Sequence, residues 1–161
     1  MKNKMTEKLF ELAYTDSMTE VQNRNAYEGR LKKLRKPNAN ISRITVIVVD
    51  VNGLKEINDS YGHFCGDDAI KTVAKALRDT IGLKADIFRI GGDEFVCISE
   101  SNVLPYISQF KDTIYFINNE KLYNLSVSIG YSRFHEKYSK SIDDIICRAD
   151  EKMYKDKKSK K

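Results

Sequence analysis

Two acidic residues follow a pair of glycines near the middle of the chain, in the stretch Gly91-Gly92-Asp93-Glu94. Apolar runs flank this stretch, Ile87-Phe88 before it and Phe95-Val96-Cys97-Ile98 after it. The pattern predicts two strands joined by a tight hairpin, in which the paired glycines adopt the positive φ of primed turns. Carboxylate oxygens bind divalent cations, and glycine lets a ligand approach the backbone closely. The tip is therefore a candidate metal site, although an ordinary solvated turn has the same short pattern.

A third acid, Asp50, follows the run Ile44-Thr45-Val46-Ile47-Val48-Val49. A nearly continuous β-branched run predicts a strand buried on both faces. A lone carboxylate at a strand end is more often a cap than a ligand. Beside an acidic hairpin tip, however, Asp50 and Asp93 would form a two-acid site for a divalent metal ion, and the presence of Glu94 favours that interpretation.

Around these acids, stretches in which apolar residues recur at helical spacing alternate with stretches typical of strands. Helices are predicted over residues 5–14, 25–36, 54–61, 64–81, 103–118 and 141–157. Strands are predicted over 44–50, on both sides of the two glycines, and over 125–131. This order predicts an α/β sandwich with a central, mostly antiparallel sheet flanked by helices. The first helix is either the end of a helix arriving from an upstream sensor domain or a packed N-terminal turn.

The composition is that of one soluble globular domain, with 161 residues, 41% of them hydrophobic and 32% charged. Lys and Arg exceed Asp and Glu by 28 to 23, but much of the net charge of +5 lies in the tail 152–161, so a nucleic-acid partner is poorly supported. Three cysteines without metal-ligand spacing predict free thiols in a reducing compartment. No stretch is apolar enough to cross a membrane, and we expect a cytoplasmic location with no membrane contact by this segment.

Two long motifs resemble those of the GGDEF family of diguanylate cyclases. The first is Gly91-Gly92-Asp93-Glu94-Phe95, and the second runs from Asp50 to Asp67. The segment from Asp16 to Arg24 is also similar to the family's entry segment, with departures at Met18, Glu20 and Val21, where Leu, Gly and Leu are usual. The resemblance implies a palm-like, nucleotidyl-cyclase-like sandwich over residues 16–161, with residues 1–15 as an N-terminal helix or a linker from an upstream domain.

The resemblance also implies a metal and phosphate site. It assigns Asp93 and Glu94 as catalytic, and it assigns two Mg²⁺ or Mn²⁺ ions to Asp50, Asp93, Glu94 and the carbonyl of Val51. The turn Asn52-Gly53-Leu54-Lys55 follows a strand and opens a helix, where free backbone N–H groups bind anions. Gly91, Gly92, Lys157 and Lys161 would contact the triphosphate. The family usually has Arg where this chain has Lys161, and both lysines are also consistent with a solvated tail.

Guanine would be read by Asn58 and Asp67, which match the two base-reading positions of the family. A carboxylate accepts hydrogen bonds from the N1–H and N2–H₂ edge of guanine, whereas adenine offers the opposite pattern, so we expect ATP to be disfavoured. His63 lies between them in the sequence, as a ribose or base contact or as a capping histidine.

The implied reaction is the condensation of two GTP to cyclic di-GMP with release of two pyrophosphates, which requires a homodimer, at least a transient one. The family's inhibitory Arg-x-x-Asp falls on Gly82 and Ala85, and that pattern occurs nowhere in the chain, so we expect no product inhibition through such a site. The alternative is a catalytically silent module that binds GTP or cyclic di-GMP. A polymerase-like enzyme is disfavoured by the guanine-reading pair and by the short chain.

Overall fold

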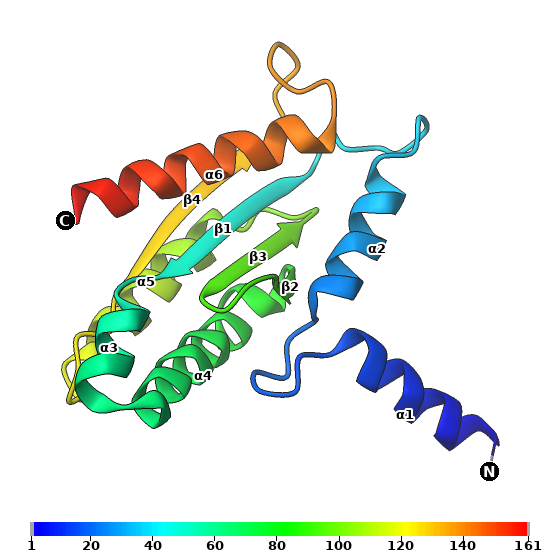
Figure 1. Cartoon of the computed structure of the whole chain (residues 1–161). Helices are drawn as coiled ribbons and strands as arrows, with labels where there is room; N and C mark the ends of the chain where they lie inside the picture. The colour runs from blue at the N-terminus through cyan, green and yellow to red at the C-terminus, as the bar shows by residue number, and fades with distance from the viewer. Residues whose placement is uncertain (1, 161) are drawn as a thin grey trace.

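The computed structural model describes the backbone of residues 2–160 and the side chains of residues 8–160. It is a three-layer sandwich in which a central sheet has helices on both faces, and one helix, α1, extends away from the body at the N-terminus (Figure 1). The elements in chain order are α1 (Lys2–Tyr14), α2 (Arg24–Leu34), β1 (Thr45–Val51), α3 (Leu54–Tyr61), α4 (His63–Asp79), the 3₁₀ turn η1 (Ile81–Leu83), β2 (Asp86–Arg89), β3 (Glu94–Ser99), α5 (Leu104–Asn118), β4 (Val127–Arg133) and α6 (Ile142–Ser159).

The sheet has four strands in the order β2-β3-β1-β4, and all its paired neighbours run antiparallel. This confirms the predicted α/β class and the antiparallel sheet. The central strand β1 is buried along its whole length, as its β-branched run predicts. Its end points toward the β2–β3 hairpin tip, because Asp50 is the register partner of Glu94.

Alternate residues of the strands enter two separate cores. Val49, Val51 and Phe95 pack on one face against α4 and α5, where Leu77 and Phe110 are fully buried. The opposite face carries a second core formed with α2 and α6 by Leu31, Leu34, Val46, Val48, Phe88, Val96, Ile98, Ile142, Ile145, Ala149 and Met153. Asp50 follows the same alternation as Val46 and Val48, so its side chain lies on the α6 face.

Two details of the predicted strands and turns are corrected. The strand predicted to end at Asp50 continues to Val51, so Asp50 lies inside it rather than at its end and is 4% exposed. The positive φ predicted for Gly91 and Gly92 is wrong, since among the described residues the glycines with positive φ are Gly53 and Gly62. The hairpin has a four-residue loop closed by a bond from the N–H of Ile90 to the carbonyl of Glu94, and loops of this length do not need a primed turn.

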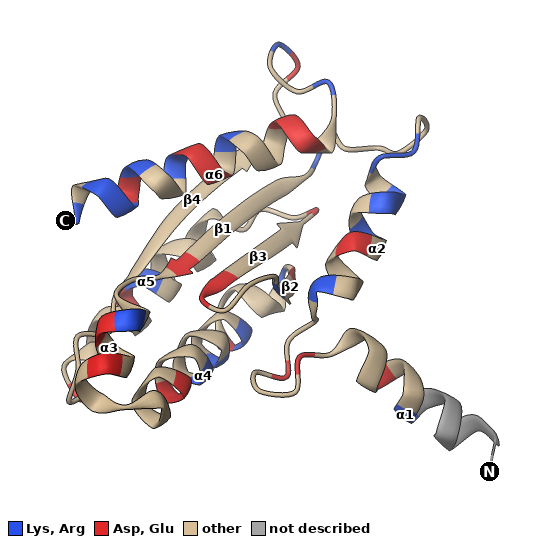
Figure 2. Cartoon of the chain, viewed as in Figure 1, with Lys and Arg blue, Asp and Glu red and all other residues tan. Residues whose placement is uncertain are grey.

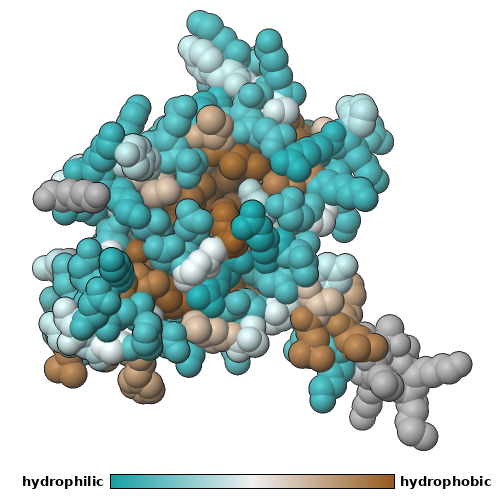
Figure 3. All heavy atoms as spheres, in the orientation of Figure 1, coloured by the Kyte–Doolittle hydropathy of each residue, from teal (hydrophilic) through white to brown (hydrophobic). Residues whose placement is uncertain are grey.

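The predicted free thiols are confirmed at Cys65, Cys97 and Cys147. Cys97 is fully buried in β3, and burial raises the pKa of its thiol to about 12, so it packs as an apolar side chain. No described helix combines the length and the apolar character needed to cross a bilayer. Large apolar side chains are nevertheless exposed on α1, where Leu9, Phe10 and Leu12 form the brown surface beside the grey N-terminus in Figure 3.

Candidate functional site

Three carboxyl groups gather where β1 ends and β3 begins, as Figure 2 shows by the acidic segments there. Asp50 and Glu94 are direct partners in the antiparallel register, so their side chains project from the same face of the sheet. Asp93 is held at the tip by its own backbone, because its carbonyl accepts the N–H of Val51 at 2.9 Å. The fold therefore brings together the three acids that the sequence singled out.

Lys157 of α6 is the cation of this cluster. Its Nζ lies 2.8 Å from Oδ1 of Asp50, and the Asp50 side chain is only 5% exposed. This hydrogen bond raises the pKa of Lys157, so the amine stays charged. The structure thus places Lys157 beside Asp50, and its predicted contact with the triphosphate stays a prediction.

The carboxyls carry more negative charge than Lys157 balances. Burial raises the pKa of Asp50 in spite of the hydrogen bond from Lys157, and the charge of Asp93 adds to the effect. The pKa of Glu94 is raised by burial, then by the charges of Asp93 and Asp50. A divalent cation would offset the repulsion among these neighbouring carboxylates. Carboxylate oxygens are also the ligands that Mg²⁺ prefers. Within residues 8–160, no group of three or more His, Cys, Asp or Glu is already arranged as a metal cluster.

A candidate anion site lies next to these acids, at the N-terminus of α3. Gly53 precedes the helix with φ +64°, a left-handed conformation that glycine adopts without strain. No side chain caps the helix there, so the first N–H groups of α3 remain available for an acceptor. Asn52, just before it, is tied to β4, where its amide donates to Ser126 at 3.1 Å and accepts from Ser128 at 2.7 Å. The Asn52 side chain therefore fixes the turn.

A cavity of about 620 Å³ connects the two features. It is large enough for a nucleotide-sized ligand. Its lining combines the turn after β1, one face of α3, the hairpin tip and the end of α6, in Val51, Asn52, Gly53, Leu54, Lys55, Glu56, Ile57, Ser60, Tyr61, Asp93, Asn124, Ser126, Lys157 and Lys160.

The family's sequence model, described as "Diguanylate cyclase, GGDEF domain", matches residues 13–161. The chain belongs to the GGDEF family. It is 31% identical over 153 residues to the probable diguanylate cyclase DgcI of Escherichia coli strain K12, covering 94% of this chain and 33% of that protein. It is also 31% identical over 170 residues to a diguanylate cyclase of Vibrio cholerae, covering 96% of this chain and 50% of that one. The chain thus spans a third to a half of the length of these relatives.

The fold is similar to that of solved GGDEF domains. The coiled coil and GGDEF domain of DgcB from Caulobacter crescentus, a structure in complex with c-di-GMP, superposes with a TM-score of 0.80. The match covers 98% of this chain and 87% of that one at 22% identity.

The residues predicted to read guanine lie at the corner between α3 and α4, outside the cavity lining. Asn58 is half-buried, and its amide lies against Gly66, where an added Cβ would be 1.9 Å from Oδ1. Asp67 follows on the first turns of α4 and is exposed, as is His63 at the start of that helix. The assignment of these three residues to the base remains a prediction.

The two glycines of the motif have different surroundings. A Cβ on Gly91 would lie 2.8 Å from Oε2 of Glu94, so a side chain there would make the end of the Glu94 side chain move. A Cβ on Gly92 would meet nothing within 4 Å, which leaves the backbone accessible to a ligand.

Seven residues of the cavity lining were not among the site residues predicted from the sequence: Glu56, Ile57, Ser60, Tyr61, Asn124, Ser126 and Lys160. Lys160 lines the cavity and is held by the carbonyl of Val127 at 2.8 Å and by Asp156 at 2.7 Å. It lies three residues after Lys157, and residues at that spacing share one helix face, so the spacing could have indicated it. Lys161, the residue assigned from the family pattern, lies outside the described residues.

Proposed function

We propose that this chain is a diguanylate cyclase, which condenses two GTP into cyclic di-GMP and releases two pyrophosphates. The observation that carries the proposal is the cluster of Asp50, Asp93 and Glu94, of which Asp93 lines a nucleotide-sized cavity that the uncapped N-terminus of α3 also lines. Family membership supports the same conclusion, as do relatives named as diguanylate cyclases.

In this proposal the acids bind metal ions and the N-terminus of α3 binds phosphate. Asp50, Asp93, Glu94 and the Val51 carbonyl would hold Mg²⁺ or Mn²⁺, two ions per site, which lowers the pKa of an attacking hydroxyl and stabilises the leaving phosphate. The N–H groups of α3 would bind phosphate oxygens, and Lys157 and Lys160 would add positive charge on the other side of the cavity.

In each half-reaction the 3′-oxygen of one GTP forms a bond to the α-phosphorus of the other, and pyrophosphate leaves. One domain holds one GTP, so two copies must face each other, at least transiently. Because the longer relatives have additional sequence, we propose that an upstream domain supplies or regulates this pairing in the cytoplasm, where GTP is available. With Gly82 and Ala85 in place of Arg-x-x-Asp, we propose no product inhibition at that site.

The test is to incubate the chain with GTP and Mg²⁺ at several protein concentrations and to separate the nucleotides by chromatography. Formation of cyclic di-GMP at a rate steeper than linear in protein supports the cyclase and its dimer. GTP that binds but stays unchanged leads to a second experiment, in which a fused coiled coil forces dimerisation. A chain still inactive as a forced dimer is a silent binding module, and the proposal is then wrong.

Asp93→Ala should lower turnover by at least about 100-fold, the scale of losing a catalytic acid or base. The fold should survive, because the bond that holds the tip uses the Asp93 carbonyl rather than its side chain. Asp112→Ala, on the exposed surface of α5, is the matched control and should keep both activity and thermal midpoint. Loss of the cooperative thermal transition in Asp93→Ala would show that this acid is structural.

A further inference from the structure

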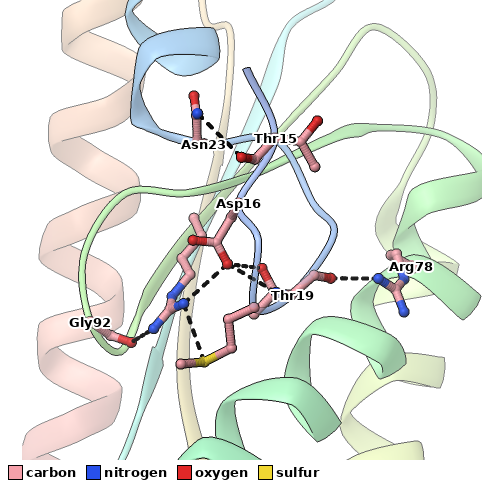
Figure 4. A network of polar contacts seen from close by, with 8 residues as sticks. Thr15, Asp16, Thr19, Asn23, Arg78 and Gly92 are labelled. Carbon is pink, nitrogen blue, oxygen red and sulfur yellow. Dashed lines mark hydrogen bonds and ion pairs between the residues drawn. The ribbon is translucent and has the colours of Figure 1, made fainter. Parts of the chain in front are cut away.

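Arg89, the last residue of β2, joins the hairpin tip to the turn that follows α1. Its Nη1 donates to Oδ1 of Asp16 at 3.1 Å, and its Nη2 donates to the carbonyl of Gly92 at 2.8 Å (Figure 4). The pair is largely buried, with the Arg89 side chain 13% exposed and that of Asp16 24% exposed. One planar guanidinium therefore bonds the N-terminal turn with one nitrogen and the residue before Asp93 with the other.

Asp16 is itself fixed in place. Its Oδ1 also accepts the N–H of Thr19 at 3.0 Å and the hydroxyl of Thr19 at 2.6 Å, and Arg78 of α4 donates to the carbonyl of Thr19 (Figure 4). Asp16 stands two residues after the end of α1. That end is bonded as well, since Asn23 donates its side-chain amide to the carbonyl of Ala13 at 2.9 Å. The position of Asp16 thus follows the position of the C-terminus of α1.

A second arginine holds the other side of the tip. Nη1 of Arg24, at the start of α2, donates to the carbonyl of Ile90 at 3.2 Å. The carbonyls on either side of Gly91 are therefore both bonded by arginines. Gly92 has no neighbour within 4 Å of its Cβ direction, so packing fixes the tip little, and these hydrogen bonds fix much of its place.

The arrangement is not the one that stability alone favours. Nε of Arg89 is buried and has no hydrogen-bond partner among the described residues. A buried donor left without a partner costs stability, which an apolar side chain at this position would avoid. What an apolar side chain would not provide is the link from Asp16 to Gly92.

We propose that Asp16 and Arg89 are positioning residues for the hairpin tip, which set the place of Asp93 and Glu94 and couple it to the end of α1. The inference rests on the proposed cyclase activity. Through this link, a displacement of α1 reaches the acids directly, without passing through the core of the sheet. Reacting groups displaced by about 1 Å lose roughly 100-fold in rate, so a small movement of the tip is sufficient to regulate turnover.

Arg89→Lys tests the link, because one ammonium lacks the planar fork that bonds both partners. We expect kcat to fall about 10- to 100-fold while KM for GTP changes less than about 3-fold, since misplaced groups act on the chemical step. Asp16→Asn keeps an acceptor oxygen for Thr19 and removes the charge, so its loss should be smaller. Asp143→Asn is the matched control: it neutralises another Arg–Asp pair, with Arg35 at 2.7 Å, which joins α6 to α2 away from the tip.

Hydrogen exchange provides a readout that does not depend on activity. The amides of Ile90 and Val51, bonded to the carbonyls of Glu94 and Asp93, should exchange several-fold faster in Arg89→Lys and unchanged in Asp143→Asn. Exchange that is unchanged at the tip, or faster throughout the sheet, overturns the proposal, as does an Arg89→Lys enzyme as active as the wild type. If the wild type makes no cyclic di-GMP even as a forced dimer, the proposed function fails, and the exchange at the tip still decides whether the link exists.

Discussion

Gly66→Ala should separate binding of guanine from folding stability. Gly66 is buried in α4, and a Cβ there would lie 1.9 Å from Oδ1 of Asn58, whereas ordinary contacts begin at 3.4 Å. The amide oxygen must therefore retreat by about 1.5 Å. Because it is the end of a flexible side chain, it retreats by rotation, at a cost of about 0.5–1.5 kcal/mol for an unfavourable rotamer.

The stability terms nearly cancel. Replacing glycine by alanine inside a helix contributes about 1 kcal/mol, which offsets the rotation of Asn58, so unfolding free energy should change by less than about 1 kcal/mol. The rotated amide no longer meets the base. Losing one hydrogen-bonding partner costs about 1–3 kcal/mol, which corresponds to a GTP affinity weaker by roughly 5- to 150-fold.

The assay is calorimetric titration with a non-hydrolysable GTP analogue, alongside denaturant unfolding. Gly29→Ala is the matched control, because Gly29 is also helical and a Cβ there meets nothing within 4 Å. It should be more stable by about 1 kcal/mol and bind the analogue like the wild type. Unchanged affinity in Gly66→Ala would refute the assignment of Asn58 to the base. A large loss of stability would show that the α3–α4 corner does not allow the Asn58 side chain to rotate.

Three further substitutions test the fold. Gly130→Ala should cost about 3 kcal/mol in urea unfolding, because its Cβ would lie 2.0 Å from the Ala149 carbonyl and backbone of α6 cannot rotate away. Glu20 has φ +61°, so Glu20→Gly should be more stable than Glu20→Ala by about 0.5–1 kcal/mol, the left-handed strain less the entropy of glycine; equal thermal midpoints would contradict this. Asp68 has a lowered pKa, since hydrogen bonds from Lys121 and Tyr123 outweigh its burial, so its carboxylate stabilises the fold above its ordinary pKa of 3.8 and loses that effect as the pH falls further. The difference in thermal midpoint between wild type and Asp68→Asn should thus shrink from pH 7 to pH 3, and a constant difference would contradict the assignment.

The fold was predictable where one element has a long and consistent pattern. The apolar face of α4 and the β-branched run of β1 each specify their element, because burial of that face fixes the period. The end of β1 was less predictable. Asp50 is polar and looks like a strand end, but its register partners Glu94 and Ser128 continue the sheet beyond it. Pairing with neighbouring strands, which the sequence does not display locally, decided that boundary.

The hairpin loop shows why the primed turn predicted at Gly91 and Gly92 was wrong. Paired glycines are typical of primed turns, but here Gly91 lies close to the carboxylate of Glu94, and a Cβ on Gly92 would meet nothing within 4 Å. Glycine thus serves close approach here rather than positive φ. Conversely, the left-handed residue of the N-terminal turn is Glu20, where the family usually has glycine. That departure in the sequence marked the position, although only the backbone revealed the strain.

Contacts between distant segments completed the site, and no local pattern predicts them. Lys157 reaches Asp50, 107 residues away in the sequence, because α6 lies directly on β4. That close approach depends on Gly130, whose missing side chain admits the backbone of α6 at Ala149 and Met153. A glycine in β4 that touches no ligand therefore sets how deeply α6 sits and hence where Lys157 and Lys160 stand. For this reason Gly130→Ala should displace both lysines together, whereas Lys157→Met should remove one charge and leave α6 in place.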